Sequence, residues 1–462
     1  MKKRLSPMDT VFLIMESPQN LMHVASMLTF QLPPQADRQA YCRQLMAHLV
    51  RHTHYAEPFD QKLAYPFLGM GAPSWVEDTQ FDLENHVHHL AIPAPGGPRE
   101  LTSLVARLHS TMLDRTRPLW EFHVIEGLKN NRFAIYFRIH HSCMDGLGRM
   151  KVIRSMLSTS ADEGFKNAPW QGNGQRWKAD PPQPLDTTLK NAFIGLANQL
   201  KIVPELASLG VSRSILHQSA APMPFDAPKT RINKASKGQR RFAYADLPLS
   251  EVKQLGKMVG ATVNDIVMSV CAMALRNYLL ELNHLPDKPL IAFVPVSLRS
   301  NSHEGGNQLS NILCNLGTHI PDLRARLDLI KQSSSEGKEI IRKLSREAAQ
   351  TLTFILQSPG MVFQLLKLSG VLNPAFNLMI SNYPGPAEKL YLGSATLESL
   401  FPVSFLFNGQ DLNITITSYV DALQFGLVGR SDGMFDMVRL ASHIQHAFLA
   451  HKEEITHPLQ NR

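Results

Sequence analysis

Two adjacent histidines, His140 and His141, follow the apolar run of residues 133–139, and Asp145 and Gly146 come shortly after them. If the run is a β-strand, successive side chains point to opposite faces, so only one of the two imidazoles can face a given cavity. His141 shares its face with the large apolar side chains of the run, and an apolar wall favours the neutral imidazole that can act as a base near pH 7. The pattern makes His141 the candidate general base and His140 the packed residue, although the pattern alone favours a structural His141 over a catalytic one. A purely structural His141 is the open alternative.

Two rival chemistries have weaker support. His86 and His88 lie on one face of a possible strand, but neither an H-E-x-x-H motif nor a Cys/His pattern accompanies them. Cys143 is close to His141, yet the sequence has no G-x-S-x-G turn and no further cysteine-enzyme signature. We therefore expect no metal site and no cysteine nucleophile.

The elements that would position these residues recur in both halves of the chain. Residues 119–141 predict a hairpin that ends at the histidine pair, residues 289–299 predict a strand, and residues 412–430 predict a second hairpin. Helical periodicity is present in residues 99–113 and 262–282. This mixture indicates an α/β (α+β) fold with two lobes of similar size.

A stretch rich in Gly, Pro, Asn and Asp at residues 159–186 is typical of a linker and divides the chain into two parts. We predict an N-terminal lobe at residues 1–158, a linker with crossover helices at 159–238, and a C-terminal lobe at 239–462. A chain of 462 residues exceeds what one core usually serves, which favours two units.

Charge and cysteine content narrow the possible partners and the compartment. The net charge of +8 suggests an anionic partner, and residues 229–241 carry six Lys or Arg and no acid. No aromatic residue separates these charges, so they do not indicate nucleic-acid binding. A phosphate-bearing cofactor, a lipid headgroup or a solvated linker fits better. The four cysteines form no C-x-x-C motif, and no secretion signal or membrane-spanning run is found, so we expect a cytoplasmic protein.

The segment "HHSCMDG" matches the HHxxxDG motif of CoA-dependent acyltransferases and condensation domains. The chain as a whole resembles one branch of that superfamily, the bacterial wax ester synthase/diacylglycerol acyltransferase family. The ordered segments that carry this resemblance are "LSPMDTVFLIMESPQNLMHV", "PLWEFHVIEGL", "TVNDIVMSV", "VPVSLR", "GNQLSN", "NLMISNYPGP" and "NGQDLNITITSYVDALQFGLVGRSD".

The resemblance implies two chloramphenicol-acetyltransferase-like lobes with the active-site tunnel at their interface. It further implies an O-acyltransferase that moves a long acyl chain from acyl-CoA to a fatty alcohol or to diacylglycerol, with acyl-CoA as substrate and no cofactor. A thioester is already activated, so one base can remove the hydroxyl proton and return it to the leaving thiolate. His141 would suffice for both transfers without an acyl-enzyme.

Roles for five further residues follow from the same resemblance or from local pattern. The resemblance implies that Asp145 pairs with Arg299 and holds the loop, and that the amide of Asn264 lies near the catalytic histidine, where it could bind the oxyanion or position substrate. A buried Asp145 would need such a partner. Gly146 would allow a sharp turn beside the CoA channel. Asp265 fits a capping box with Thr262.

Several alternatives stay open at this point. The donor could be an acyl carrier protein, as in a condensation-type acyltransferase, or the chain could be a lipid-binding protein without catalysis. Residues 348–387 contain one charged side chain, Lys367, and could form core, a tunnel wall or a contact with a membrane or lipid droplet. We expect peripheral association with membrane or lipid inclusions.

Overall fold

The computed structural model describes residues 3–5, 7–65, 73–172, 220–233, 238–298, 308–343, 373–407, 409–433 and 436–456. Arg299, most of the predicted crossover 159–238, and residues 348–372 of the uncharged segment lie outside the described residues.

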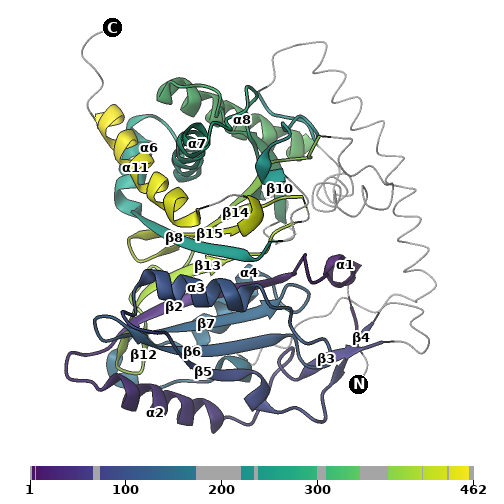
Figure 1. Ribbon diagram of the computed structural model, residues 1–462, viewed down its shortest axis with the longest axis vertical. Helices are drawn as coiled ribbons and strands as arrows, with labels where there is room; N and C mark the ends of the chain where they lie inside the picture. Colours follow the sequence, from purple (N-terminus) through teal and green to yellow (C-terminus); the bar gives the residue numbers. More distant parts are fainter. Residues whose placement is uncertain are drawn as a thin grey trace.

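The N-terminal lobe is a six-stranded sheet in the order β12-β13-β2-β7-β6-β5, beside a small sheet in the order β1-β4-β3 (Figure 1). The strands are β1 (Lys3–Arg4), β2 (His23–Gln31), β3 (Gln61–Ala64), β4 (Ser74–Glu77), β5 (Val87–Ala91), β6 (Trp120–Leu128), β7 (Arg132–His140), β12 (Tyr391–Leu392) and β13 (Ala395–Val403). Its helices are α1 (Pro7–Met15), α2 (Arg38–Val50), α3 (Pro98–His109) and α4 (Gly146–Ser155).

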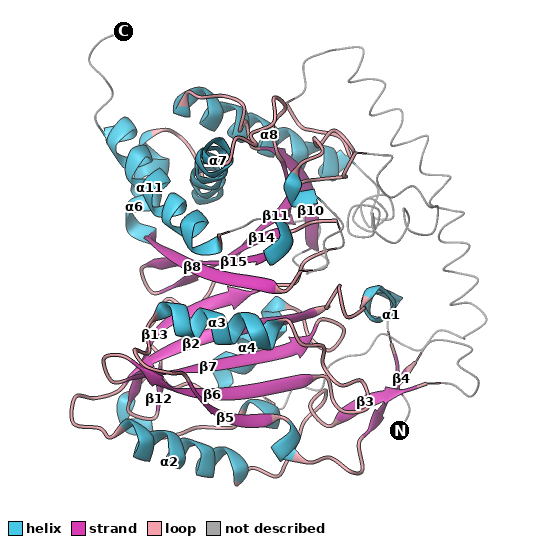
Figure 2. Ribbon diagram, viewed as in Figure 1, coloured by secondary structure: helices cyan, strands magenta, loops and turns pink. Residues whose placement is uncertain are grey.

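The C-terminal lobe is a second six-stranded sheet in the order β10-β9-β11-β14-β15-β8, with helices packed on it (Figure 2). The strands are β8 (Arg240–Pro248), β9 (Ile291–Leu298), β10 (Gln308–Asn315), β11 (Leu378–Tyr383), β14 (Leu412–Tyr419) and β15 (Ala422–Arg430). The helices are α6 (Leu249–Met258), α7 (Val263–Glu281), α8 (Leu323–Lys343) and α11 (Met437–Thr456). Short 3-10 turns are η2 (Leu83–Asn85), η3 (Ala161–Glu163), η4 (Pro169–Gln171), η5 (Arg231–Asn233) and η6 (Ser431–Gly433).

Both predicted hairpins form, as β6–β7 and β14–β15. The first turns through Asn130 and Asn131, both at positive φ, which is the conformation that tight hairpin turns require and that Asn tolerates well. The predicted helices 99–113 and 262–282 correspond to α3 and α7. The predicted α/β (α+β) class is confirmed.

Two strands from the C-terminal part of the chain, β12 and β13, belong to the N-terminal sheet. The linear division into 1–158 and 239–462 does not include this crossing. Strand β13 comes from the C-terminal part of the chain but pairs antiparallel with β2 of the N-terminal sheet. It also lies against β15: a Cβ on Gly426 would come within 1.7 Å of the carbonyl oxygen of Pro402, so glycine allows the two sheets to approach closely. A strand's alternating pattern shows which side chains are buried but not which sheet it joins, so the sequence does not reveal the place of β13.

No single helix among the described residues has the length and apolar composition to cross a bilayer. Helices α6 and α7 meet that test only jointly, with a bend of 99° between them.

Candidate active site

His141 is the first residue after β7, and its backbone is held in place by Met22, the residue directly before β2. Its N–H donates to the carbonyl of Met22 at 2.9 Å. Its ring lies between two phenylalanines, with ring centroids 4.3 Å from Phe12 and 5.3 Å from Phe405. Phe405 follows β13 in the chain, so the apolar contacts of His141 come from segments far from β7 in sequence, which the sequence pattern did not identify.

The apolar surroundings determine the charge of His141. Burial lowers the pKa of its imidazole to about 4; the charge of Asp145 opposes this shift, while those of His140 and Arg149 add to it. Of the effects on this pKa, a hydrogen bond with the residue's own backbone is the smallest, and it opposes the shift as well. His141 is therefore neutral at pH 7, as a general base requires.

His140 is fully buried and makes different contacts. The N–H of Ser142 donates to its Nδ1 at 3.1 Å, and the Ser142 hydroxyl lies 2.6 Å from the same atom. Because Nδ1 accepts the backbone hydrogen bond, the proton belongs on Nε2, which lies 3.4 Å from Oε1 of Glu16. The adjacent histidines thus have different surroundings: His140 is buried beside Glu16, and His141 lies between two phenylalanines, while the catalytic role of His141 stays a prediction.

Glu16 is a residue that sequence reasoning did not assign. Its side chain has no exposed surface, yet its carboxylate receives the Met22 N–H at 3.1 Å and the Arg115 guanidinium at 3.1 and 3.2 Å. Burial would raise the pKa of Glu16, but the neighbouring His140 imidazole, the Met22 N–H and the charge of Arg115 together lower it below its ordinary value. The sequence signal that could have identified Glu16 is its position as a charged residue directly after the apolar helix α1.

Asp145 and Gly146 differ from expectation. Asp145 is exposed and caps α4, with its carboxylate accepting the N–H of Gly148 at 2.7 Å. The argument that a buried Asp145 needs a cationic partner therefore does not apply, and the proposed partner Arg299 lies outside the described residues. Gly146 has no positive φ and a Cβ there would meet nothing within 4 Å, so the turn itself does not require glycine.

Asn264 and Asp265 lie in the first turn of α7. Asp265 forms the predicted capping box: its carboxylate accepts from the N–H of Thr262 at 2.9 Å, and its own N–H donates to the Thr262 hydroxyl at 3.2 Å. The amide oxygen of Asn264 accepts a hydrogen bond from Asn382 on β11 at 2.7 Å. Asn382 thus orients the amide of Asn264; its distance from His141 stays a prediction.

Arg149 is a second residue that the sequence did not single out. It lies on α4, is 4% exposed, and has Nη2 3.5 Å from the hydroxyl of Tyr383. Its Nη1 is buried without a hydrogen-bond partner among the described residues. A buried cation with so little compensation is costly unless an anion joins it. Since its charge also acts on His141, Arg149 is suited to receive negative charge that develops near that base.

The rival chemistries have little structural support. Cys143 is buried, and burial raises the pKa of its thiol, which opposes formation of a nucleophilic thiolate. His86 stacks on Phe81 and Trp120, and its Nδ1 bonds to the carbonyl of Trp120 at 2.8 Å. His86 therefore packs rather than sharing a ligand role with His88.

The chain is similar to known proteins along its whole length. Residues 5–267 match the model of the wax ester synthase/diacylglycerol acyltransferase catalytic domain, and residues 305–452 match the corresponding C-terminal domain. An O-acyltransferase of Acinetobacter baylyi is 36% identical over 96% of this chain and 95% of its own. A probable diacylglycerol O-acyltransferase of Mycobacterium tuberculosis is 36% identical over 96% and 97%.

Solved structures agree with these matches. A wax ester synthase/diacylglycerol acyltransferase from Marinobacter aquaeolei VT8 is 33% identical, with a TM-score of 0.78 and 98% of both chains covered. A starter condensation domain of rhizomide synthetase, 15% identical with a TM-score of 0.54 over 99% of this chain and 95% of its own, shares the fold.

We predict that His141→Ala lowers kcat/KM by about 10²–10⁴, the usual contribution of a general base, whereas His140→Ala acts mainly through stability. The neutral imidazole of His141 is the active form, and the pKa of this group is lowered to about 4. The loss of kcat/KM with falling pH should therefore occur well below pH 6.5. Initial rates between pH 4 and 8, with circular dichroism of each variant, check this. Equal losses in well-folded samples of both variants would contradict the assignment.

A second prediction concerns Glu16→Gln, which keeps the shape of the side chain but removes its charge. Breaking a buried pair costs roughly 2–5 kcal/mol, so thermal stability and kcat should both fall. Glu398→Gln is the matched control, because it disrupts an exposed contact with Arg132 at 3.5 Å and should cost about 1 kcal/mol or less. Unchanged stability and turnover in Glu16→Gln would show that its contacts position nothing.

Proposed function

Because the chain belongs to the wax ester synthase/diacylglycerol acyltransferase family of acyltransferases, we propose that it transfers a long acyl chain from acyl-CoA to the hydroxyl of a fatty alcohol, of a diacylglycerol, or of both. The observation that carries this proposal is the neutral imidazole of His141, which lies between the rings of Phe12 and Phe405. Such apolar surroundings suit long hydrocarbon substrates, and such a base suits a hydroxyl acceptor.

The reaction needs one base and one site for negative charge. His141 removes the hydroxyl proton as the oxygen attacks the thioester carbonyl, which creates a tetrahedral oxyanion. When this intermediate collapses, the C–S bond breaks and the imidazolium returns the proton to the CoA sulfur. The products are the ester and CoA, and His141 is neutral again. Arg149 and Asn264 are our candidates for stabilising the oxyanion or positioning the substrates.

A hollow of about 460 Å³ lies between α4 and the turn at residues 384–386, and Lys151 and Arg154 line it. We propose that this hollow receives the phosphates of CoA, since it is adjacent to the helix that follows His141. Arg154 is partly engaged by Glu388, which leaves Lys151 as the more available cation. The basic segment 229–241 is less suitable than its sequence suggests, because Arg240 is buried between the lobes.

The alternative with an acyl carrier protein as donor has less support. The condensation domains that resemble this chain are 13–15% identical and share the fold alone. The relatives at 36% identity are acyltransferases named for diacylglycerol or as O-acyltransferases.

Purified protein supplied with long-chain acyl-CoA and either a fatty alcohol or a diacylglycerol should form a wax ester or a triacylglycerol.

Because His141 suffices as base, we expect direct transfer, intersecting initial-rate lines, and substantial activity in Cys143→Ala. Lipid chromatography and mass spectrometry of the protein after incubation with acyl-CoA alone check this. A stoichiometric burst of CoA with acylated Cys143 and an inactive Cys143→Ala protein would overturn the mechanism.

We also propose peripheral contact with a lipid surface near the active site. Ile14 is 66% exposed on α1, two residues from the Phe12 that packs on His141, and Leu147 is 44% exposed on α4. Ile14→Lys should lower flotation with phosphatidylcholine vesicles containing diacylglycerol by about tenfold, since burying one large aliphatic side chain contributes roughly 1.5–3 kcal/mol. Leu449→Lys is the control, because Leu449 is 59% exposed on the distant α11. Equal losses in both variants, or none, would refute this surface.

A further inference from the structure

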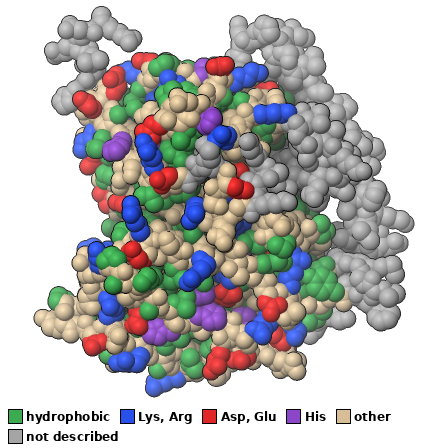
Figure 3. All heavy atoms as spheres, viewed as in Figure 1, with side chains coloured by type: hydrophobic (Ala, Val, Ile, Leu, Met, Phe, Trp, Pro, Cys, Tyr) green, Lys and Arg blue, Asp and Glu red, His purple; other side chains and the backbone are tan. Residues whose placement is uncertain are grey.

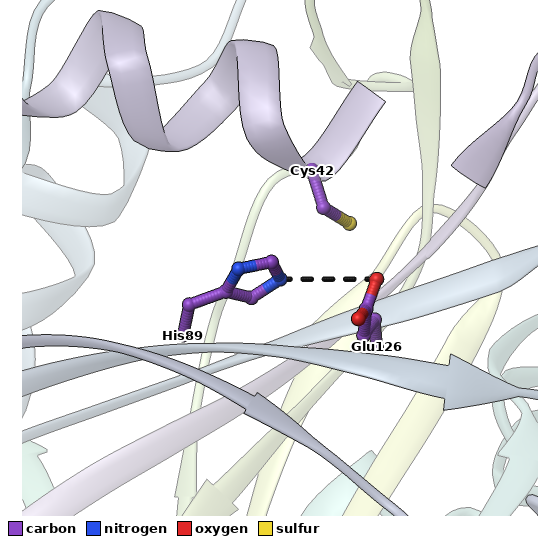
Figure 4. A group of neighbouring side chains, drawn as sticks. All are labelled: Cys42, His89 and Glu126. Carbon is purple, nitrogen blue, oxygen red and sulfur yellow. Dashed lines mark ion pairs between the residues drawn. The ribbon is translucent and has the colours of Figure 1, made fainter. Parts of the chain in front are cut away.

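Three potential metal ligands meet on the outer side of the N-terminal sheet, where α2 covers β5 and β6 (Figure 4). They are Cys42 on α2, His89 on β5 and Glu126 on β6, and one ligand atom of each lies within 4.8 Å of the others. Figure 4 shows the Cys42 thiol and the His89 ring directed toward the Glu126 carboxylate. All three side chains come from well-formed elements that the active site does not use.

Strand pairing brings the two sheet residues together. In the parallel pair β5–β6, His89 is opposite Val124 and Ala91 is opposite Glu126, so His89 and Glu126 lie two positions apart along the sheet. The preceding residue, His88, points to the other face, because successive strand residues alternate. The His89 side chain is 30% exposed; Figure 3, which labels no residue, shows that histidine side chains in general reach the surface of the lower lobe. A metal ion can therefore reach this site from solvent.

The spacing of the ligand atoms fits an ion better than a direct contact. His89 Nε2 and Glu126 Oε2 are 3.8 Å apart, which is too long for a hydrogen bond. Two ligands that each lie about 2.1 Å from a tetrahedral Zn²⁺ are about 3.4 Å apart. Oε2 of Glu126 is buried and has no hydrogen-bond partner among the described residues. A buried carboxylate oxygen normally accepts a hydrogen bond, whereas this one has only the longer ion-pair contact with His89 that Figure 4 marks with a dashed line, and a bound cation would supply the missing compensation.

The protonation of Cys42 determines whether its sulfur can bind a metal ion. Burial raises the pKa of the Cys42 thiol to about 12, and the Glu126 carboxylate adds to this effect, while Arg38 opposes it. The guanidinium of Arg38 donates to the carbonyl of Leu128 at 2.6 Å. A divalent cation between thiolate and carboxylate would reverse the electrostatic preference, and its binding would release the thiol proton to solvent.

A second cluster on the opposite face of the same strands is already neutralised. Glu121 accepts hydrogen bonds from Arg138 at 2.7 Å and lies 2.9 Å from His123. Burial would raise the pKa of Glu121, but His123 and Arg138 lower it to about 2. His88 completes this group. Because an arginine occupies the carboxylate, this cluster has no need of a metal and provides a control.

We propose that Cys42, His89 and Glu126 form a Zn²⁺ site, completed by a water molecule, that joins α2 to the β5–β6 edge. A thiolate, an imidazole and a carboxylate are the donors that Zn²⁺ accepts, and their two negative charges balance the ion. The site lies at the outer edge of the N-terminal lobe, away from the C-terminal lobe (Figure 1). Its role is to hold structure, so acyl transfer does not depend on it.

The test uses full-length, tag-free protein that has been stripped with a chelator and dialysed against Zn²⁺ or Co²⁺. Wild type should bind about one Zn²⁺ per chain and, with Co²⁺, show the charge-transfer absorption of a cobalt thiolate. Cys42→Ala should lose this absorption and at least about 100-fold in Zn²⁺ affinity, since even outer partners of a metal site contribute 10–100-fold. Glu126→Gln, which nearly preserves shape, should weaken Zn²⁺ binding and keep the cobalt-thiolate signal at higher metal concentration.

His88→Gln is the matched control, one residue away on the other face, and should bind Zn²⁺ as wild type does. Zn²⁺ should raise the Tm of wild type and of His88→Gln but not that of Cys42→Ala, and acyl transfer should be retained in all of them. Absence of the cobalt-thiolate absorption in wild type would overturn the proposal. So would Zn²⁺ binding that is lost in His88→Gln and kept in Cys42→Ala.

Discussion

The buried carboxylate of Glu16 is the contact on which the geometry of the active site depends. It has no exposed surface and is compensated by Arg115, the Met22 N–H and His140. Removing any one of these groups would weaken the compensation of a negative charge in an apolar environment. The segment from Glu16 to Met22 is therefore held to the end of β7, and the same segment supplies the carbonyl that binds the His141 N–H.

Both lobes hold this segment. From the C-terminal lobe, Arg240 donates to the carbonyl of Leu21 at 2.7 Å and Arg430 to that of Gln19 at 2.7 Å. Arg240 is so enclosed that burial lowers its pKa to about 9. Buried guanidiniums that bind carbonyls across a lobe interface act as fixed spacers, because moving the lobes apart would leave charges unpaired. The position of His141 is thus coupled to the packing of both sheets.

Features that depend on neighbours in sequence were the ones that could be predicted. The hairpin ending at the histidine pair, the alternation of His140 and His141, and the capping box of Thr262 and Asp265 follow from periods and spacings of a few residues. Features that depend on contacts between residues far apart in sequence could not be predicted. The insertion of β13 into the first sheet, the burial of Arg240 and the pairing of Glu16 with His140 each join residues far apart in sequence. The exposure of Asp145 was missed because its role as a helix cap, which needs only the next turn, was not weighed against a buried ion pair.

Among the described residues no carboxylate is hydrogen-bonded to His141, the proposed base, whereas Glu16 lies beside His140. A carboxylate next to His141 would stabilise its protonated form and raise its pKa, as an opposite charge does. That change would help remove the hydroxyl proton but would slow its return to sulfur. An imidazolium with a pKa of about 4 is a far stronger acid than a thiol, whose pKa is about 8.5, so protonation of the leaving thiolate is strongly favourable. Glu16 meets the neighbouring His140 instead, where it fixes the backbone and leaves the base weak. In the proposed mechanism this arrangement would favour expulsion of CoA over build-up of a charged histidine, which suits a donor that is already activated.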